Sequence, residues 1–111
     1  AQEIYESLGL WDGLKSSGKV SFASNVKEVL TQVASGAVDC GVVYSTDAAS
    51  APDQVEIAAD APAGSHAPIT YPAAILKAAS DKAEARSFVD FLKGEEASDV
   101  LRRMGFAIPE R

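Results

Sequence analysis

Few side chains in this sequence could carry out covalent or metal chemistry. The chain has one histidine, His66, and one cysteine, Cys40. A metal site needs several His, Cys, Asp or Glu side chains close together, and the sequence shows no such cluster. Nucleophilic catalysis needs a Ser or Cys beside a His base, whereas Cys40 lies in an apolar run that predicts a buried thiol. A small hydrolase or thiol enzyme that uses Cys40 or His66 is therefore the weaker hypothesis.

Backbone amides could instead bind an anion where a helix begins after Asn25. Asn25 is a favourable N-cap, and Glu28 follows three residues later in the position of a capping box. The first N–H groups of a helix lack an intrahelical acceptor and carry the positive end of the helix dipole, so that of Val26 could donate to an oxyanion. The alternative is a cap satisfied by Asn25 and water. The apolar residues of this helix recur at helical spacing: Val26, Val29, Leu30 and Val33.

Tyr44 is a second candidate donor, because its hydroxyl is a neutral hydrogen-bond donor at the end of the apolar run 38–44. That run is rich in β-branched residues and predicts a strand buried in a sheet. Ordinary packing of the ring is the alternative. Ligands of α/β proteins bind beyond the carboxyl ends of strands, which is where Tyr44 would lie.

The remaining elements alternate between helix and strand. We expect a helix over 3–8 closed by Gly9, a loop over 58–68 and a long helical region from 81 onward, interrupted at Gly94. Short strands are expected at 20–22, 38–44, 55–57 and 69–76. Such alternation predicts an α/β fold, a three-layer mixed sheet with helices on both faces.

Composition limits the function classes. The 111 residues are 47% hydrophobic, and 10 basic residues against 16 acidic ones give a net charge of −6. These values predict one globular domain. The acidic balance and the absence of a Lys/Arg block argue against nucleic acid as a partner. A small anion remains compatible, because backbone dipoles act locally.

Two segments resemble the second lobe of periplasmic molybdate-binding proteins, the substrate-binding components of ABC transporters for molybdate and tungstate. These segments are Asn25–Leu30 and Ser35–Ala48, the latter with its Val43-Tyr44-Ser45-Thr46-Asp47-Ala48 string. The resemblance implies one lobe of a Venus-flytrap fold, the type 2 periplasmic binding protein fold. It also implies a tetrahedral oxyanion, molybdate or tungstate, held by neutral donors between two lobes. The matching donors are the backbone N–H of Val26 and the hydroxyl of Tyr44, with Asn25 as the supporting cap.

The same resemblance implies a binding protein without catalytic activity or cofactor, located in the periplasm or otherwise outside the cytoplasm, with a membrane permease as partner. Family members are considerably longer, so we expect a fragment. Residues 1–80 would form the second-lobe core, and residues 81–111 the helical region that packs on the first lobe. Without that lobe, the stripe containing Phe88, Phe91 and Leu92 would favour self-association. The alternative is the sensing lobe of a regulator, or of a binding protein for another small anion.

Overall fold

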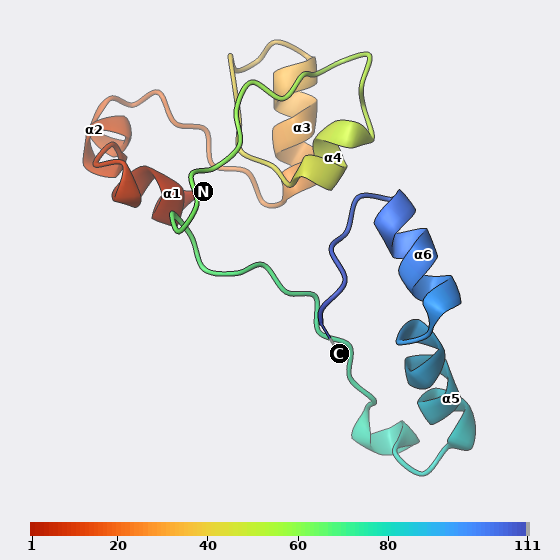
Figure 1. Ribbon diagram of the computed structural model, residues 1–111. Helices are drawn as coiled ribbons and strands as arrows, with labels where there is room; N and C mark the ends of the chain where they lie inside the picture. The colour runs from red at the N-terminus through yellow and green to blue at the C-terminus, as the bar shows by residue number, and fades with distance from the viewer. Residues whose placement is uncertain (111) are drawn as a thin grey trace. The chain divides into compact units, whose positions relative to one another are not determined.

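The computed structural model describes residues 1–110, and every regular element in this range is helical (Figure 1). The elements are α1 (Gln2–Ser7), α2 (Trp11–Ser16), α3 (Val26–Ala34), α4 (Ser45–Ala49), a 3-10 turn η1 (Lys77–Ala79), α5 (Ala83–Leu92) and α6 (Glu95–Arg103). They belong to two compact units, Ala1–Pro68 and Ile69–Arg111. In the first unit α1 contacts α2 and α3 contacts α4, and in the second α5 contacts α6.

The expected three-layer α/β fold is wrong for the described chain. Residues 1–110 contain no β-strand, and the segments 20–22, 38–44, 55–57 and 69–76 have no regular secondary structure. The physical reason lies in the range of the hydrogen bonds. A helix satisfies its backbone groups within four residues, whereas a strand forms only beside a neighbouring strand that accepts and donates along its length. Alternating apolar residues show that a segment suits a sheet, but they do not supply the partner strand.

The helices follow the signals that the sequence carries locally. The helix expected after Asn25 runs from Val26 to Ala34 and ends before Gly36, whose φ of +76° is a left-handed conformation that glycine adopts readily. The expected helical region near the C-terminus forms α5 and α6, with Gly94 as the N-cap of α6. No helix was predicted for the segment that forms α2, which has few apolar residues at helical spacing.

Packing within each unit is sparse. Among the described residues, only Ser65, Ala97 and Ser98 are buried, and the chain exposes 9,048 Å². Two separate compact units of these lengths would expose about 7,000 Å² in total. Cys40 is exposed, so the expectation of a buried core thiol is also wrong. The reason is the same for all of the apolar segments: without a sheet there is no second layer to cover them.

A few longer-range contacts hold each unit together. In the first unit the rings of Trp11 and Phe22 meet edge to face with centroids 6.2 Å apart, and Oε2 of Glu3 accepts the N–H of Ala67 at 2.7 Å. In the second unit the rings of Tyr71 and Phe106 meet edge to face at 5.6 Å. None of the helices within residues 1–110 has the length and apolar character needed to cross a membrane.

Candidate functional site

The N-terminus of α3 is built by hydrogen bonds within five residues. Oδ1 of Asn25 accepts the N–H of Glu28 at 2.9 Å, and Asn25 itself is extended, with φ −159° and ψ 168°. Val26 is the first residue of the helix. Its N–H has no acceptor inside the helix and lies at the positive end of the helix dipole. This geometry gives the chain one fixed amide donor at a helix terminus.

Glu28 holds the chain just before this cap. Its Oε2 accepts the backbone N–H of Ser24 at 2.8 Å and the hydroxyl of Ser24 at 2.7 Å. These hydrogen bonds, the backbone one first, lower the pKa of Glu28 below its ordinary value of 4.5 because they favour the ionised carboxylate. The segment that precedes α3 is therefore tied to the first turn of the helix by the Glu28 side chain as well as by Asn25.

The backbone of Tyr44 is also fixed by hydrogen bonds, at the start of α4. Tyr44 is the N-cap residue, with φ −74° and ψ 150°, and its N–H donates to Oδ2 of Asp47 at 3.2 Å. Its carbonyl accepts the N–H groups of Asp47 and Ala48 at 3.0 and 3.3 Å. Tyr44 is 39% exposed, so part of the residue is accessible to a ligand. Its backbone is thus fixed at both polar groups.

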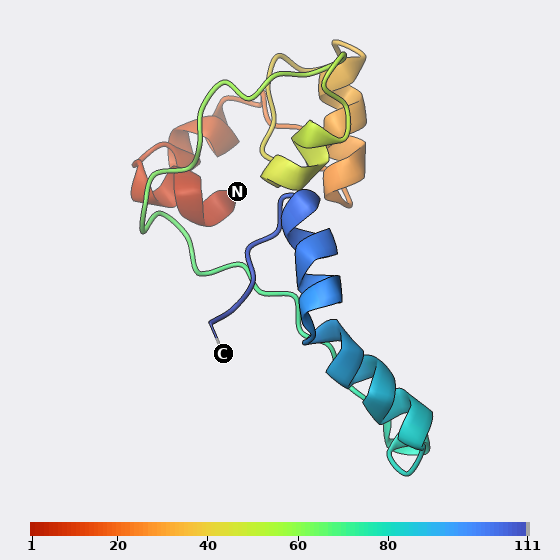
Figure 2. The same ribbon diagram turned by 45° about the vertical axis from the view of Figure 1, so that its right-hand side comes forward.

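The two candidate donors belong to contacting helices of one unit. Helices α3 and α4 are in contact, and α4 lies beside the end of α3 that carries Val26 (Figures 1 and 2). The segment that connects them crosses the apolar side of α3 at Gly41. A Cβ built on Gly41 would lie 2.5 Å from Cγ1 of Val29 and 3.1 Å from Cγ2 of Val33. The sequence-predicted residues Asn25, Val26 and Tyr44 therefore lie on two adjoining elements.

The charges near these donors are negative. Glu28 and Asp47 each stand at the third position of a helix, where a carboxylate complements the dipole. Both carboxylates already accept backbone N–H groups, so they serve the caps. Lys27 is the adjacent basic residue, and it is exposed. An anion bound here would be held mainly by neutral donors, in the presence of two carboxylates that oppose it.

Three contributing residues were missed as functional candidates: Ser24, Gly41 and Asp47. A signal existed for two of them. An isolated glycine within an apolar run indicates a close approach of another chain segment, and an acidic residue three positions after a helix start indicates a capping interaction. Ser24 carried no comparable signal, because the capping box predicts that Glu28 reaches the N–H of Asn25 instead.

The other chemistry-bearing residues lie apart from this arrangement. Nδ1 of His66 lies 2.8 Å from the carbonyl oxygen of Ala67, and Cys40 is exposed. Within residues 1–110, no three His, Cys, Asp or Glu side chains come close enough together to hold a metal ion. A hollow of about 590 Å³ lies in the second unit between α6 and residues 108–110, and one of about 190 Å³ lies beside Trp11. Neither hollow includes Val26 or Tyr44.

Comparison with known proteins gives a family match along nearly the whole chain. The family model described as bacterial extracellular solute-binding protein matches residues 1–107. A protein of Bacillus subtilis named as an ABC transporter substrate-binding lipoprotein, YvgL, is 39% identical over 105 residues, which are 95% of this chain and 39% of YvgL.

Two further relatives are named as molybdate-binding proteins. ModA of Escherichia coli is 34% identical over 108 residues, covering 97% of this chain and 40% of ModA. ModA of Haemophilus influenzae is 36% identical over 107 residues, covering 96% and 41%. The chain thus spans about two fifths of the length of each relative. No solved structure matches the chain significantly.

Proposed function

Because the chain belongs to the bacterial extracellular solute-binding protein family, we propose that it supplies part of the binding site for a tetrahedral oxyanion, molybdate or tungstate. One observation carries the proposal. The N-terminus of α3, with the N–H of Val26, and the N-cap of α4, Tyr44, lie on contacting helices in a chain whose relatives include two molybdate-binding proteins.

Neutral donors suit such a ligand. An oxyanion can be satisfied by N–H and O–H groups without a counter-charge when those groups are fixed before the ligand arrives. Here the hydrogen bonds of Asn25 and Glu28 fix the backbone around Val26, and Asp47 fixes that of Tyr44. The net charge of −6 is compatible with this mode, since the dipole and the donors act over short distances.

Two donors are too few for strong binding. A tetrahedral oxyanion has four oxygens, and one that keeps an open face to water gains little affinity over its hydrated state. Since the relatives are longer than this chain, we propose that residues beyond these 111 supply the remaining donors. Residues 1–111 would then form one side of the site.

The family assignment also bears on role, partner and location. We propose a binding role without catalysis, delivery of the anion to the membrane permease of an ABC importer, and a location outside the cytoplasm. The support is the family description, which is of extracellular solute-binding proteins, and the relative named as a lipoprotein. The alternative is a sensing or binding protein of the same family for another small anion, which the ligand panel below distinguishes.

The test uses the full-length protein and isothermal titration with molybdate, tungstate and sulfate. Val26→Pro is the informative variant. Proline is favoured at the first position of a helix and lacks an N–H, and the extended Asn25 before it is compatible with proline. The variant removes the donor and leaves the helix intact. We expect a loss of molybdate affinity of about tenfold to a hundredfold, the usual value of a hydrogen bond to a charged group.

Val26→Ala is the matched control, since it shortens the same side chain and keeps the N–H. Tyr44→Phe removes the second donor and should cost a similar factor. Wild-type affinity in both Val26→Pro and Tyr44→Phe would contradict the proposed site. Equal affinity of the wild-type protein for sulfate and molybdate, or binding of neither, would contradict the proposed ligand.

We propose a second copy of the chain as a partner of the second unit. Phe88 and Phe91 are 61% and 48% exposed, and α6 is acidic in its first turn and basic in its last. An antiparallel pairing of two copies along α5 and α6 would cover these two phenylalanines of α5 and place the oppositely charged ends of the two α6 helices side by side. Sedimentation velocity should detect a dimer that Phe88→Ser with Phe91→Ser disrupts. A monomer at all concentrations would contradict it.

A further inference from the structure

Gly41 is the point where the segment between α3 and α4 comes closest to α3. A Cβ at this position would lie 2.5 Å from Cγ1 of Val29 and 3.1 Å from Cγ2 of Val33. Carbon atoms in favourable contact are about 3.5–4.0 Å apart. Any side chain at position 41 would therefore force the segment away from α3 by about 1 Å.

The two valine side chains that Gly41 faces cannot easily move aside. Val29 and Val33 stand one turn apart inside α3, and both are half-buried. A valine within a helix has one strongly preferred χ1 rotamer, so its methyl groups cannot rotate aside without cost. No positive φ is found at Gly41, so the requirement for glycine there is one of space.

This contact joins the two segments that carry the proposed donors. Val29 belongs to the helix that begins with Val26, and Gly41 stands three residues before Tyr44. The N–H of Tyr44 is bound to Asp47, which ties Tyr44 to α4. A displacement at position 41 is therefore passed to the start of α4. We infer that Gly41 is a positioning residue of the oxyanion site, one that sets the spacing between the Val26 amide and the Tyr44 hydroxyl.

The inference rests on the proposed function, and Gly41→Ala in the full-length protein tests it by titration with molybdate. We expect about tenfold weaker binding, because one of the donors would move by more than the range of donor–acceptor distances, about 0.5 Å, over which a hydrogen bond stays strong. Gly13→Ala is the matched control: Gly13 lies in α2, and a Cβ there meets no atom within 4 Å. That variant should bind molybdate like the wild type.

A second substitution separates positioning from stability. Val29→Ala removes the methyl that the new Cβ would meet, so Gly41→Ala with Val29→Ala should recover most of the lost affinity although the double variant has less apolar packing. A purely structural role predicts the opposite, a further loss. If Gly41→Ala does not fold, Val29→Ile pushes on the same segment from the side of α3 and should also weaken binding.

The outcomes are distinct. A wild-type protein that does not bind molybdate overturns the proposed function and this inference with it. A wild-type protein that binds molybdate, together with Gly41→Ala or Val29→Ile of unchanged affinity, overturns the inference alone. Weakened binding by Gly41→Ala without recovery in the double variant also overturns it. Weakened binding with recovery supports the positioning role.

Discussion

Oε2 of Glu28 accepts two hydrogen bonds from one residue, Ser24: the backbone N–H at 2.8 Å and the hydroxyl at 2.7 Å. In a standard capping box this carboxylate would reach the N–H of the N-cap residue. Here it reaches one residue further back, past Asn25. The first turn of α3 is thereby joined to the chain that precedes it, and the joint depends on the charge of Glu28.

The contact between Glu28 and Ser24 should therefore depend on pH. Hydrogen bonds from Ser24 lower the pKa of Glu28 in the folded chain below 4.5. A carboxylate with a lowered pKa contributes stability above its unfolded-state pKa, and that contribution is lost as the pH falls through the lowered value. We expect the carboxyl carbon of Glu28 to titrate below pH 4.5 by NMR.

Ser24→Ala removes the hydroxyl and keeps the backbone donor, so the midpoint should rise part of the way toward the ordinary value. Ser50→Ala, a serine at the end of α4, is the control and should leave the midpoint unchanged. A Glu28 that titrates at its ordinary pKa in the wild-type protein would contradict the role of Ser24.

The start of α3 could be predicted from the sequence because its determinants are local. Asn25 and Glu28 act within four residues, and Gly36 ends the same helix. The segment 38–44 shows the opposite case. Its β-branched residues suit a strand, but a strand needs a partner that local sequence cannot specify, and none is found within residues 1–110.

The candidate site divides in the same way. Val26 as a first-turn amide followed from nearby residues, whereas Tyr44 was expected at the end of a strand and is instead the N-cap of α4. The contact of Gly41 with Val29 did not follow from nearby residues, because it depends on where the connecting segment crosses α3. Exposure of Cys40 likewise depends on which elements cover the segment, and no spacing in the sequence encodes that.

The hydrogen bond between Glu3 and Ala67 should protect the amide of Ala67 from solvent exchange. Oε2 of Glu3 accepts this N–H at 2.7 Å across 64 positions, and it ties the loop before Pro68 to α1. Glu3→Ala should bring the exchange rate of the Ala67 amide close to that of an unprotected amide, as measured by hydrogen exchange with NMR. Glu3→Gln keeps an acceptor oxygen and should retain part of the protection. Fast exchange in the wild type would contradict the contact.

Cys40 should react readily in the 111-residue chain. Its exposure allows iodoacetamide to reach the sulfur without prior unfolding. We expect the alkylation rates in native buffer and in denaturant, both measured by mass spectrometry, to agree within about threefold. Cys40→Ser is the control for labelling at other residues. Protection of Cys40 by an order of magnitude in native buffer would mean that the thiol is buried, which would contradict the structure.

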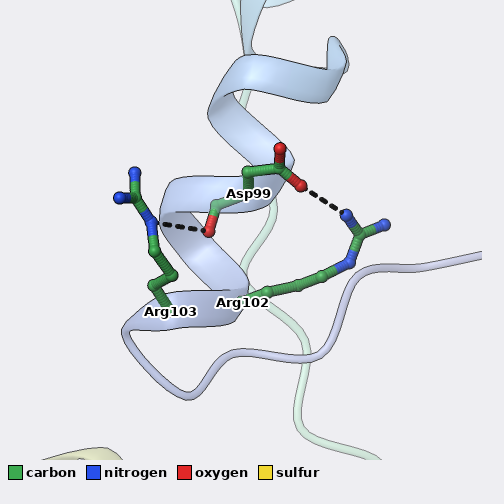
Figure 3. A network of polar contacts seen from close by, with 3 residues as sticks. All are labelled: Asp99, Arg102 and Arg103. Atoms are coloured by element: carbon green, nitrogen blue, oxygen red, sulfur yellow. Dashed lines mark hydrogen bonds and ion pairs between the residues drawn. The ribbon is translucent and has the colours of Figure 1, made fainter.

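The ion pair between Asp99 and Arg102 should contribute little to stability. Nη1 of Arg102 lies 3.0 Å from Oδ1 of Asp99, yet the side chains of Arg102 and Asp99 are 59% and 68% exposed. The carbonyl oxygen of Asp99 separately accepts Nε of Arg103 at 3.4 Å, on the other side of the helix (Figure 3). Because water screens exposed charges, Asp99→Asn should change the free energy of unfolding by less than about 0.5 kcal/mol.

Ala97, two residues earlier on α6, provides the contrast. It is 7% exposed, and a charge placed there would lose its hydration. Ala97→Asp should therefore destabilise the protein by about 2 kcal/mol or more. Urea denaturation of this variant and of Asp99→Asn measures both free energies of unfolding under the same conditions. High salt should leave the difference between wild type and Asp99→Asn nearly unchanged, since that difference is already small. A larger cost for Asp99→Asn than for Ala97→Asp would mean that charge pairing, rather than burial, holds α6 in place.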